Sequence, residues 1–177
     1  KGLVIVPRGV KPNLKKSIFN IITAGHPLPN SNSLKAGKNL ISFLNQTTKN
    51  DFVLFLISGG GSSLSVLPYS ISLREKILVN HVLIRSGANI NEIASIRKHL
   101  SLIKGGRLIE NMNCEGISFL VSDVIGDDIS SISSGITYCD KSTFSDSLKI
   151  IKKFSLKQKL PKSVIHVLES GLKGKIP

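Results

Sequence analysis

The sequence contains no tryptophan, one methionine and only two cysteines among its 177 residues. Cys114 and Cys139 stand well apart, with no Cys-x-x-Cys motif and no histidine at the spacing of a metal site. A disulfide framework and a structural zinc site are therefore disfavoured, and two reduced thiols are the simplest interpretation.

Long apolar runs are also missing. No apolar segment is long enough to span a bilayer, and no signal-peptide pattern opens the sequence. We therefore expect a cytoplasmic protein. The composition, 41% hydrophobic and 20% charged, is typical of a globular chain with room for one α/β domain. Because the sequence begins at Lys1 rather than Met, we expect residues 1–177 to be a fragment of something longer.

Acidic residues are scarce: 11 Asp and Glu face 24 Lys and Arg, a formal charge of +13. The lysines are scattered over helical and loop segments, and aromatic residues do not interleave with them as a base-stacking surface would require. A solvated basic surface explains the charge best, and nucleic acid is a disfavoured partner. A non-catalytic module that binds anions or RNA stays open as an alternative.

Short apolar segments alternate with segments of helical periodicity along the whole chain. Strands are predicted at residues 3–7, 19–24, 52–57 and 116–121, and connections this short favour a mostly parallel sheet. The segment 52–57 is apolar without alternation, which predicts a strand buried on both faces. No repeat or linker divides the chain, so we expect a single α/β unit.

Cap residues predict where the helices begin and end. Ser72 with Glu75 forms a capping box, and a second N-terminus is marked by Thr143 with Asp146. Further boundaries are predicted at Ser31 or Ser33, at Pro161 and at Gly171. A helix over 91–104 is expected to end before the Gly105-Gly106 pair.

A glycine-rich loop follows the 52–57 strand. Its residues are small throughout: Ser58, Gly59, Gly60, Gly61, Ser62 and Ser63. Three glycines allow positive φ and let successive N–H groups face an anion. Neither a Walker A loop nor a Gly-x-Gly-x-x-Gly fingerprint is present, so both of those phosphate-binding families are disfavoured. A tight turn of purely structural purpose is the competing interpretation.

Cationic side chains recur beside the apolar stripe of the 91–104 helix. The helical period places Arg97 and Lys104 on one side, roughly 10 Å apart along the axis, while Lys98 projects away. Two such cations can neutralise the charge that develops in phosphoryl transfer. Ordinary surface cations are the alternative.

Three carboxylates follow the 116–121 strand: Asp123, Asp127 and Asp128. Mg²⁺ usually takes one or two protein carboxylates and completes its shell with water and phosphate oxygens. We favour Asp123 as a ligand because it directly follows the strand, at the edge where open α/β sheets bind ligands. A solvated turn is an equal alternative for Asp127 and Asp128.

Two further loops carry candidate binding groups. His26 lies between Gly25 and Pro27 and could orient a substrate hydroxyl, or simply brace its turn by a hydrogen bond. Small residues recur at 133–137, where Ser134, Gly135 and Thr137 offer hydroxyl and N–H groups.

Taken together, five segments resemble the glycerate 2-kinase family in order and spacing. They are Ala24-Gly25-His26-Pro27-Leu28-Pro29, residues 58–63, Arg97-Lys98-His99-Leu100-Ser101 with Lys104-Gly105-Gly106-Arg107, residues 122–128, and Ser134-Gly135-Ile136-Thr137. The resemblance implies a three-layer, Rossmann-like α/β domain with helices on both faces of a mostly parallel sheet. Residues 1–177 would be most of that larger domain, without the family's N-terminal segment and its C-terminal MOFRL domain.

The same resemblance implies an activity. The enzyme would transfer the γ-phosphate of ATP, with Mg²⁺, to the 2-hydroxyl of D-glycerate, giving 2-phosphoglycerate. Arg97, Lys104 and Asp123 would be catalytic, the 58–63 loop with Ser134, Gly135 and Thr137 would hold the nucleotide, and His26 and Lys98 the substrate. Residues 1–177 alone should be inactive or very weak, and a homodimer stays open.

The sequence also departs from the family pattern. Asn30 stands where an aspartate is common, Ile136 replaces a proline, and Asp140-Lys141-Ser142-Thr143 replaces Asp-Pro-Thr-Thr. The contribution of the His26 turn is therefore in question. A kinase or reductase of another small hydroxy acid, of the hydroxypyruvate or tartronate type, is the main rival function.

Overall fold

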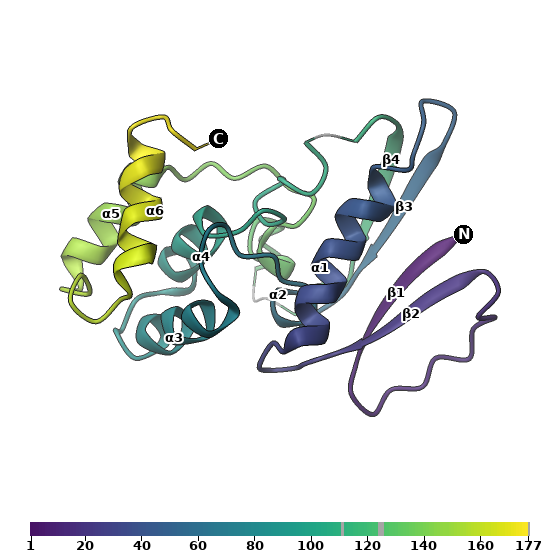
Figure 1. The fold of residues 1–177 in the computed structure, drawn as a ribbon, viewed down its shortest axis with the longest axis horizontal. Helices are drawn as coiled ribbons and strands as arrows, with labels where there is room; N and C mark the ends of the chain where they lie inside the picture. Colours follow the sequence, from purple (N-terminus) through teal and green to yellow (C-terminus); the bar gives the residue numbers. More distant parts are fainter. Residues whose placement is uncertain (111, 124–125, 177) are drawn as a thin grey trace.

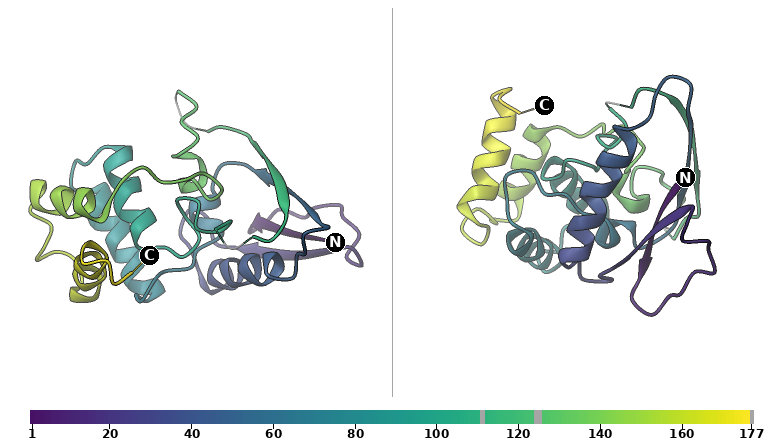
Figure 2. Two further views of the ribbon diagram at one scale, coloured as in Figure 1. Left: turned by 90° about the horizontal axis from the view of Figure 1, so that it is seen from above. Right: turned by 45° about the vertical axis from the view of Figure 1, so that its right-hand side comes forward.

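The computed structural model describes residues 1–110, 112–123 and 126–176. The strands gather with one helix at one end of the molecule and four helices gather at the other, so that the two termini lie at different ends (Figure 1). Figure 2 shows the same division from two further directions. We call the first part, β1 to β4 with α1, the strand layer, and the second, α3 to α6, the helical lobe.

All strand pairing within named strands of the described chain is parallel. β1 (Gly2–Pro7) pairs with β2 (Phe19–Ala24), and β3 (Phe52–Ile57) pairs with β4 (Glu115–Leu120). Each pair forms a two-stranded sheet in full register, and both sheets lie beside α1 (Ser31–Leu44). The predicted α/β class with parallel strands is confirmed, and the four strands fall within a residue of their predicted bounds.

One face of the β3–β4 sheet is covered and the other is open. Val53 is buried in an apolar cluster with Leu44 of α1 and Ile103. Alternate residues point the opposite way, and Leu56 is 74% exposed. The residues of this open face are Phe52, Leu54, Leu56, Ile117, Phe119 and Val121. The prediction of a strand buried on both faces is therefore wrong for β3 in this chain, because the helices of the lobe pack on one another instead.

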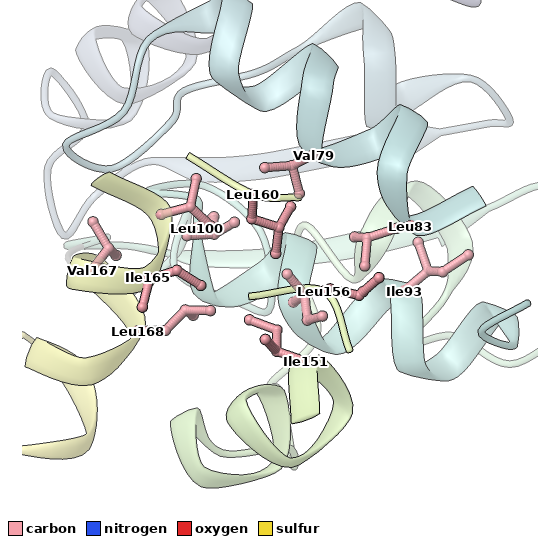
Figure 3. Packing of buried hydrophobic residues seen from close by; sticks show 12 residues of the cluster. Val79, Leu83, Ile93, Leu100, Ile151, Leu156, Leu160, Ile165, Val167 and Leu168 are labelled. Atoms are coloured by element: carbon pink, nitrogen blue, oxygen red, sulfur yellow. The ribbon is translucent and has the colours of Figure 1, made fainter. Parts of the chain in front are cut away.

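The helical lobe has an apolar core of its own. It is built by α3 (Leu73–Ile84), α4 (Ile90–His99), α5 (Phe144–Lys153) and α6 (Lys162–Leu172). Side chains from all four helices converge in Figure 3. Leu83, Ile96 and Leu168 of this core are fully buried. No helix among the described residues is both long and apolar enough to cross a membrane.

The predicted capping boxes of Ser72 and Thr143 are confirmed, but the cap of α1 is not the residue expected. Asn30 has an extended backbone, and its Oδ1 accepts a hydrogen bond from Ser33 N at 3.1 Å. In return, Ser33 Oγ accepts a hydrogen bond from Asn30 N. Neither Ser31 nor Ser33 is thus the cap. An amide oxygen satisfies a free N–H at a helix start as well as a hydroxyl does.

Two helix ends differ from prediction. α4 ends at His99 rather than Lys104, because Ser101 pairs with Pro68 and Leu102 N donates to Leu67 O at 2.8 Å, which draws the chain into extended pairing. Gly171 does not close α6. It lies inside the helix, where any side chain would overlap the Phe144 ring, and α6 continues to Leu172.

Candidate active site

The glycine loop leaves β3 at Ile57 and enters the single turn of α2 (Gly61–Leu64). Gly60 has φ +79° and precedes this turn as its N-cap, a conformation that favours glycine. Among the described residues, the N–H groups of Gly59 and Gly60 donate to no acceptor. The loop therefore presents backbone donors that the described chain does not use.

Each of the three glycines is approached by a different loop. A side chain at Gly59 would overlap the Asp123 carboxylate, and one at Gly60 would come within 2.8 Å of the His26 ring. A side chain at Gly61 would overlap Ser133 Oγ. The glycines are thus required by close packing with the His26 turn and with two stretches that follow β4, which a bare tight turn would not need.

The small-residue loop after β4 is tied directly to the glycine loop. It contains a short 3₁₀ turn, η1 (Ile132–Ser134). Ser133 and Ser134 of this turn have φ of 50° and 60°, and Gly135, which caps its C-terminal end, has φ 61°. Ser134 Oγ lies 2.7 Å from Ser62 Oγ, and Ser133 Oγ donates to Ser58 O at 3.1 Å. The structure thus brings the predicted Ser134 beside the glycine loop, whereas Gly135 O accepts a hydrogen bond from Gly106 N at 2.8 Å.

Thr137, predicted to bind nucleotide, has a different neighbour. Its Oγ1 accepts a hydrogen bond from Ser118 Oγ of β4 at 3.0 Å. This contact fastens the end of the small-residue loop to the strand. Ile136 beside it is 7% exposed and packs into the cluster beneath α1, so this position is apolar core.

Lys104 binds the backbone of the glycine loop. It is 4% exposed, and its Nζ donates to Gly61 O at 2.9 Å. Burial lowers the pKa of Lys104 well below its ordinary value, and repulsion from Lys76 and Arg97 lowers it further. Burial also lowers the pKa of the Arg97 guanidinium. Arg97 and Lys104 therefore repel each other, but they do not share the predicted 91–104 helix, since α4 ends at His99.

Lys98 points inward rather than away from the core. Its Nζ lies 3.3 Å from Asp140 Oδ1, and both side chains are largely buried. Asp140 also accepts from the backbone N and hydroxyl of Ser142. Lys98 and Asp140 line a polar cavity together with Asp128 and Ser130. The substrate contact predicted for Lys98 stays a prediction, and in this structure the partner of its ammonium is Asp140.

The three acidic residues have unequal environments. Asp123 is exposed and lies against Gly59. Asp128 accepts from Ser130 and Ser131 in its own turn, and these hydrogen bonds lower the pKa of its carboxyl, with Ser131 contributing most. Asp127 is exposed with φ +52°. Residues 124 and 125 of this motif lie outside the described residues.

A Mg²⁺ ion fits this loop only in part. No three His, Cys, Asp or Glu side chains gather as a ligand set in residues 1–110, 112–123 and 126–176. A single carboxylate next to a phosphate site is nevertheless enough for Mg²⁺, which keeps most of its water. Asp123 fits that role, whereas the oxygens of Asp128 already accept hydrogen bonds from its turn.

The His26 turn is braced by Asn30. Gly25 N donates to Asn30 Oδ1 at 3.2 Å and to Ser33 Oγ at 3.1 Å, which fixes the turn on the first residues of α1. Asn30 therefore keeps a structural role where the resemblance led us to expect an aspartate. His26 itself is exposed, and its ring faces Gly60.

The chain is similar to proteins of a known family. A family described as "Domain of unknown function (DUF4147)" matches residues 1–169. A protein of Pyrococcus horikoshii named glycerate 2-kinase is 40% identical over 176 residues, which cover 99% of this chain and 40% of that protein. A protein of Agrobacterium vitis named putative hydroxypyruvate reductase is 41% identical, over 86% of this chain and 35% of that protein.

A solved structure agrees with these matches. The crystal structure of glycerate kinase from Thermotoga maritima superposes with a TM-score of 0.87 at 38% identity, over 94% of this chain and 40% of that one. This chain belongs to the DUF4147 family. The predicted resemblance to the glycerate 2-kinases is confirmed, and the chain spans about two fifths or less of the length of these relatives.

In this DUF4147 chain, sequence reasoning missed two charged residues near the site. Asp140 was noted only as part of a divergent run, yet it binds Lys98. Lys76 lies on α3 and repels both Arg97 and Lys104. Nothing local distinguishes Lys76 from the other 23 Lys and Arg residues, since its place at the site depends on how α3 packs against α4.

Proposed function

We propose that the protein containing this chain is a glycerate 2-kinase, which phosphorylates D-glycerate at the 2-hydroxyl with ATP and Mg²⁺. The proposal is supported by one observation above all. Three loops converge on the three glycines and bring the Asp123 carboxylate, the His26 ring and the Ser133 hydroxyl to one place, above buried Lys104. The names of the relatives agree with it.

The reaction is an in-line displacement. The 2-hydroxyl oxygen attacks the γ-phosphorus, the bond from this phosphorus to the bridging oxygen breaks, ADP leaves, and the hydroxyl proton is lost to a base or to solvent. Bound Mg²⁺ would neutralise charge on the phosphate oxygens. Within this chain, the free N–H groups of Gly59 and Gly60 would donate to those oxygens, and Asp123 would hold the ion or orient the hydroxyl.

The cations would act on the developing charge. Negative charge spreads over the equatorial oxygens as the phosphoryl group transfers, and preorganised cations stabilise it most when they are shielded from water. Lys104 is buried and fixed on Gly61 O, and Arg97 lies near it. His26 beside Gly60 would contact the acceptor.

The test compares two glycines of matched backbone in the full-length protein. Gly60 and Gly87 have φ of 79° and 81°, but a side chain at Gly87 would meet nothing within 4 Å. Gly60→Ala and Gly87→Ala therefore carry similar backbone strain, and only the former displaces His26. We expect Gly60→Ala to lower kcat/KM for ADP release with D-glycerate about 100-fold, as misplaced reacting groups do. Equal activity of the two variants would rule out the glycine-loop site.

A reductase is the second candidate, because two relatives are named putative hydroxypyruvate reductase. The two functions separate in one assay series with the full-length protein. A kinase releases ADP with D-glycerate and ignores NADH, whereas a reductase consumes NADH with hydroxypyruvate and ignores ATP. Hydroxypyruvate and tartronate as ATP-dependent acceptors would distinguish the related kinases.

A further inference from the structure

Lys76, Arg97 and Lys104 lie close enough beside the glycine loop to repel one another, and no carboxylate pairs with them in the described part of the chain. Lys104 is buried, and the described chain gives its Nζ one acceptor, Gly61 O. Lys76 and Arg97 are half-buried, and within the described residues their side chains form neither a hydrogen bond nor an ion pair. An ammonium has three donors and a guanidinium has five, so most of the donors in this cluster are unused.

Other buried cations of this chain are paired. Lys98, 6% exposed, binds Asp140, and the half-buried Arg107 donates to Ser101 O at 2.8 Å and lies over the Phe144 ring. The protein thus does provide partners for inward cations elsewhere. Like charges gathered out of water without a counterion are costly, and an anion between them reverses the sign of that interaction.

Lys76 is part of the core-facing side of α3 rather than its solvated side. Residues 76, 80 and 83 recur at helical spacing on one face, and Leu83 is fully buried. Asn80 Oδ1, one turn beyond Lys76, is buried and accepts no hydrogen bond within the described residues. This face of α3 therefore carries a cation and a hydrogen-bond acceptor that both lack partners.

We propose that Lys76 is a third binding residue of the site, and that it holds a small oxyanion together with Arg97 and Lys104. The oxyanion is the carboxylate of a hydroxy acid or a phosphate group, which present the same chemistry to three cations. Its assignment to a kinase substrate rests on the proposed function, whereas the binding of the anion does not. Burial, and to a smaller degree repulsion from Arg97, lowers the pKa of Lys76 to about 8, as expected for an inward-facing cation that has no carboxylate partner among the described residues.

The experiment uses the full-length protein and three variants. Lys76→Met removes the charge with similar length, Lys76→Arg keeps the charge, and Lys38→Met removes a charge from the exposed side of α1 as the control. Thermal midpoints are measured alone and with inorganic phosphate, D-glycerate or ATP, and affinities are derived from their concentration dependence. Initial rates of ADP release give KM and kcat for each variant.

We expect Lys76→Met to weaken binding of one oxyanion ligand by about 10- to 100-fold, the usual range for a lost charged hydrogen bond. Lys76→Arg and Lys38→Met should stay within about threefold of wild type, a difference too small for a lost charged hydrogen bond. Without ligand, Lys76→Met should melt no lower than wild type, because it relieves repulsion. Weaker binding of D-glycerate alone would assign the carboxylate, and weaker binding of ATP or phosphate would assign the phosphate.

The opposite pattern overturns the proposal. If Lys76→Met lowers the melting temperature without ligand and leaves every affinity unchanged, Lys76 is a structural residue paired elsewhere in the full-length protein. Wild-type turnover with an unchanged KM in Lys76→Met would retain the kinase and reject this inference. Phosphate binding that depends on Lys76 in a protein without kinase activity would retain the inference and reject the proposed function.

Discussion

The helical lobe and the strand layer bury their apolar residues differently. In the lobe, side chains from four helices enclose one core, and residues such as Leu83 and Leu168 are fully buried (Figure 3). In the strand layer, α1 covers one face of β3 and β4, while Phe52, Leu56 and Val121 on the other face are more than half exposed. A helix bundle closes on itself, whereas a sheet needs a layer on each face.

The two parts also contribute different groups to the candidate active site. The loops that meet at the glycines follow β2, β3 and β4, at the carboxyl ends of parallel strands. The cations that face them come from α3, α4 and the segment after α4, which belong to the lobe or its border. We infer that the lobe provides a rigid support and the strand layer provides the loops.

The largest expected loss of stability comes from opening a cavity in the core of the lobe. Ile96→Ala removes a fully buried side chain and should lower the free energy of unfolding by about 2–5 kcal/mol. Leu56→Ala on the open face should change it by no more than about 0.5 kcal/mol. Urea unfolding of both variants measures the contrast, and equal losses would show that the open face is packed in solution.

The pH dependence of stability should come from the cation cluster. The pKa of Lys76 is lowered by burial and by Arg97 to about 8 in the folded state, from 10.5. Between these values the unfolded chain holds the proton more tightly, so the free energy of unfolding should rise with pH from about 8 toward 10.5. The rise should be smaller in Lys76→Met, where buried Lys104 with its own lowered pKa still contributes, and unchanged in Lys153→Met, as measured by urea unfolding across that range.

Substitutions at two helix caps should distinguish a residue that supports only the lobe from one that also supports a loop of the candidate site. Thr143→Ala and Asn30→Ala each remove a capping-box side chain and should cost about 1 kcal/mol of stability. Asn30→Ala also removes the acceptor of Gly25 N and should lower activity by loosening the His26 turn. Thr143→Ala should leave kcat/KM unchanged in the full-length protein, and Asn30→Asp should restore what Asn30→Ala loses. Parallel unfolding and rate measurements decide this.

The smallest effect is expected at the surface of the lobe. Lys153 Nζ lies 2.6 Å from Glu92 Oε1 and joins α5 to α4, but its side chain is 62% exposed. Lys153→Met should cost less than about 1 kcal/mol, and the cost should shrink in high salt. Lys152→Met, which removes an exposed neighbouring charge, is the matched control. A larger or salt-independent loss of stability in Lys153→Met would mean that the Lys153–Glu92 pair is a main link within the lobe.

Much of the fold was predictable because its signals are local. Apolar runs between turns located all four strands, and Ser72 and Thr143 located two helix starts, since hydrogen bonds at a helix end depend on neighbouring residues. The end of α4 was not predictable. Pairing of Ser101 with Pro68 and of Leu102 with Leu67 stops that helix, and this partner lies some thirty residues away.

The candidate site likewise has features that the sequence predicts and features that depend on tertiary packing. Convergence of the loops at 26, 58–63, 123 and 133–135 follows from parallel strands, whose carboxyl ends share one edge. The orientation of Lys98 toward Asp140 and the approach of Lys76 to Arg97 depend on how α3 and α4 pack, and periodicity alone placed Lys98 outward.

The sequence by itself thus determined the parallel α/β class, the position of the glycine loop and the family to which this chain belongs. These depend on local hydrogen bonding, on apolar periodicity and on ordered motifs. Only the tertiary structure decided that each glycine is packed against a residue from another loop and that one sheet face is open. It also decided that three cations repel one another with no carboxylate paired to them among the described residues. Contacts between distant segments depend on packing and charge in three dimensions, which no single stretch of sequence encodes.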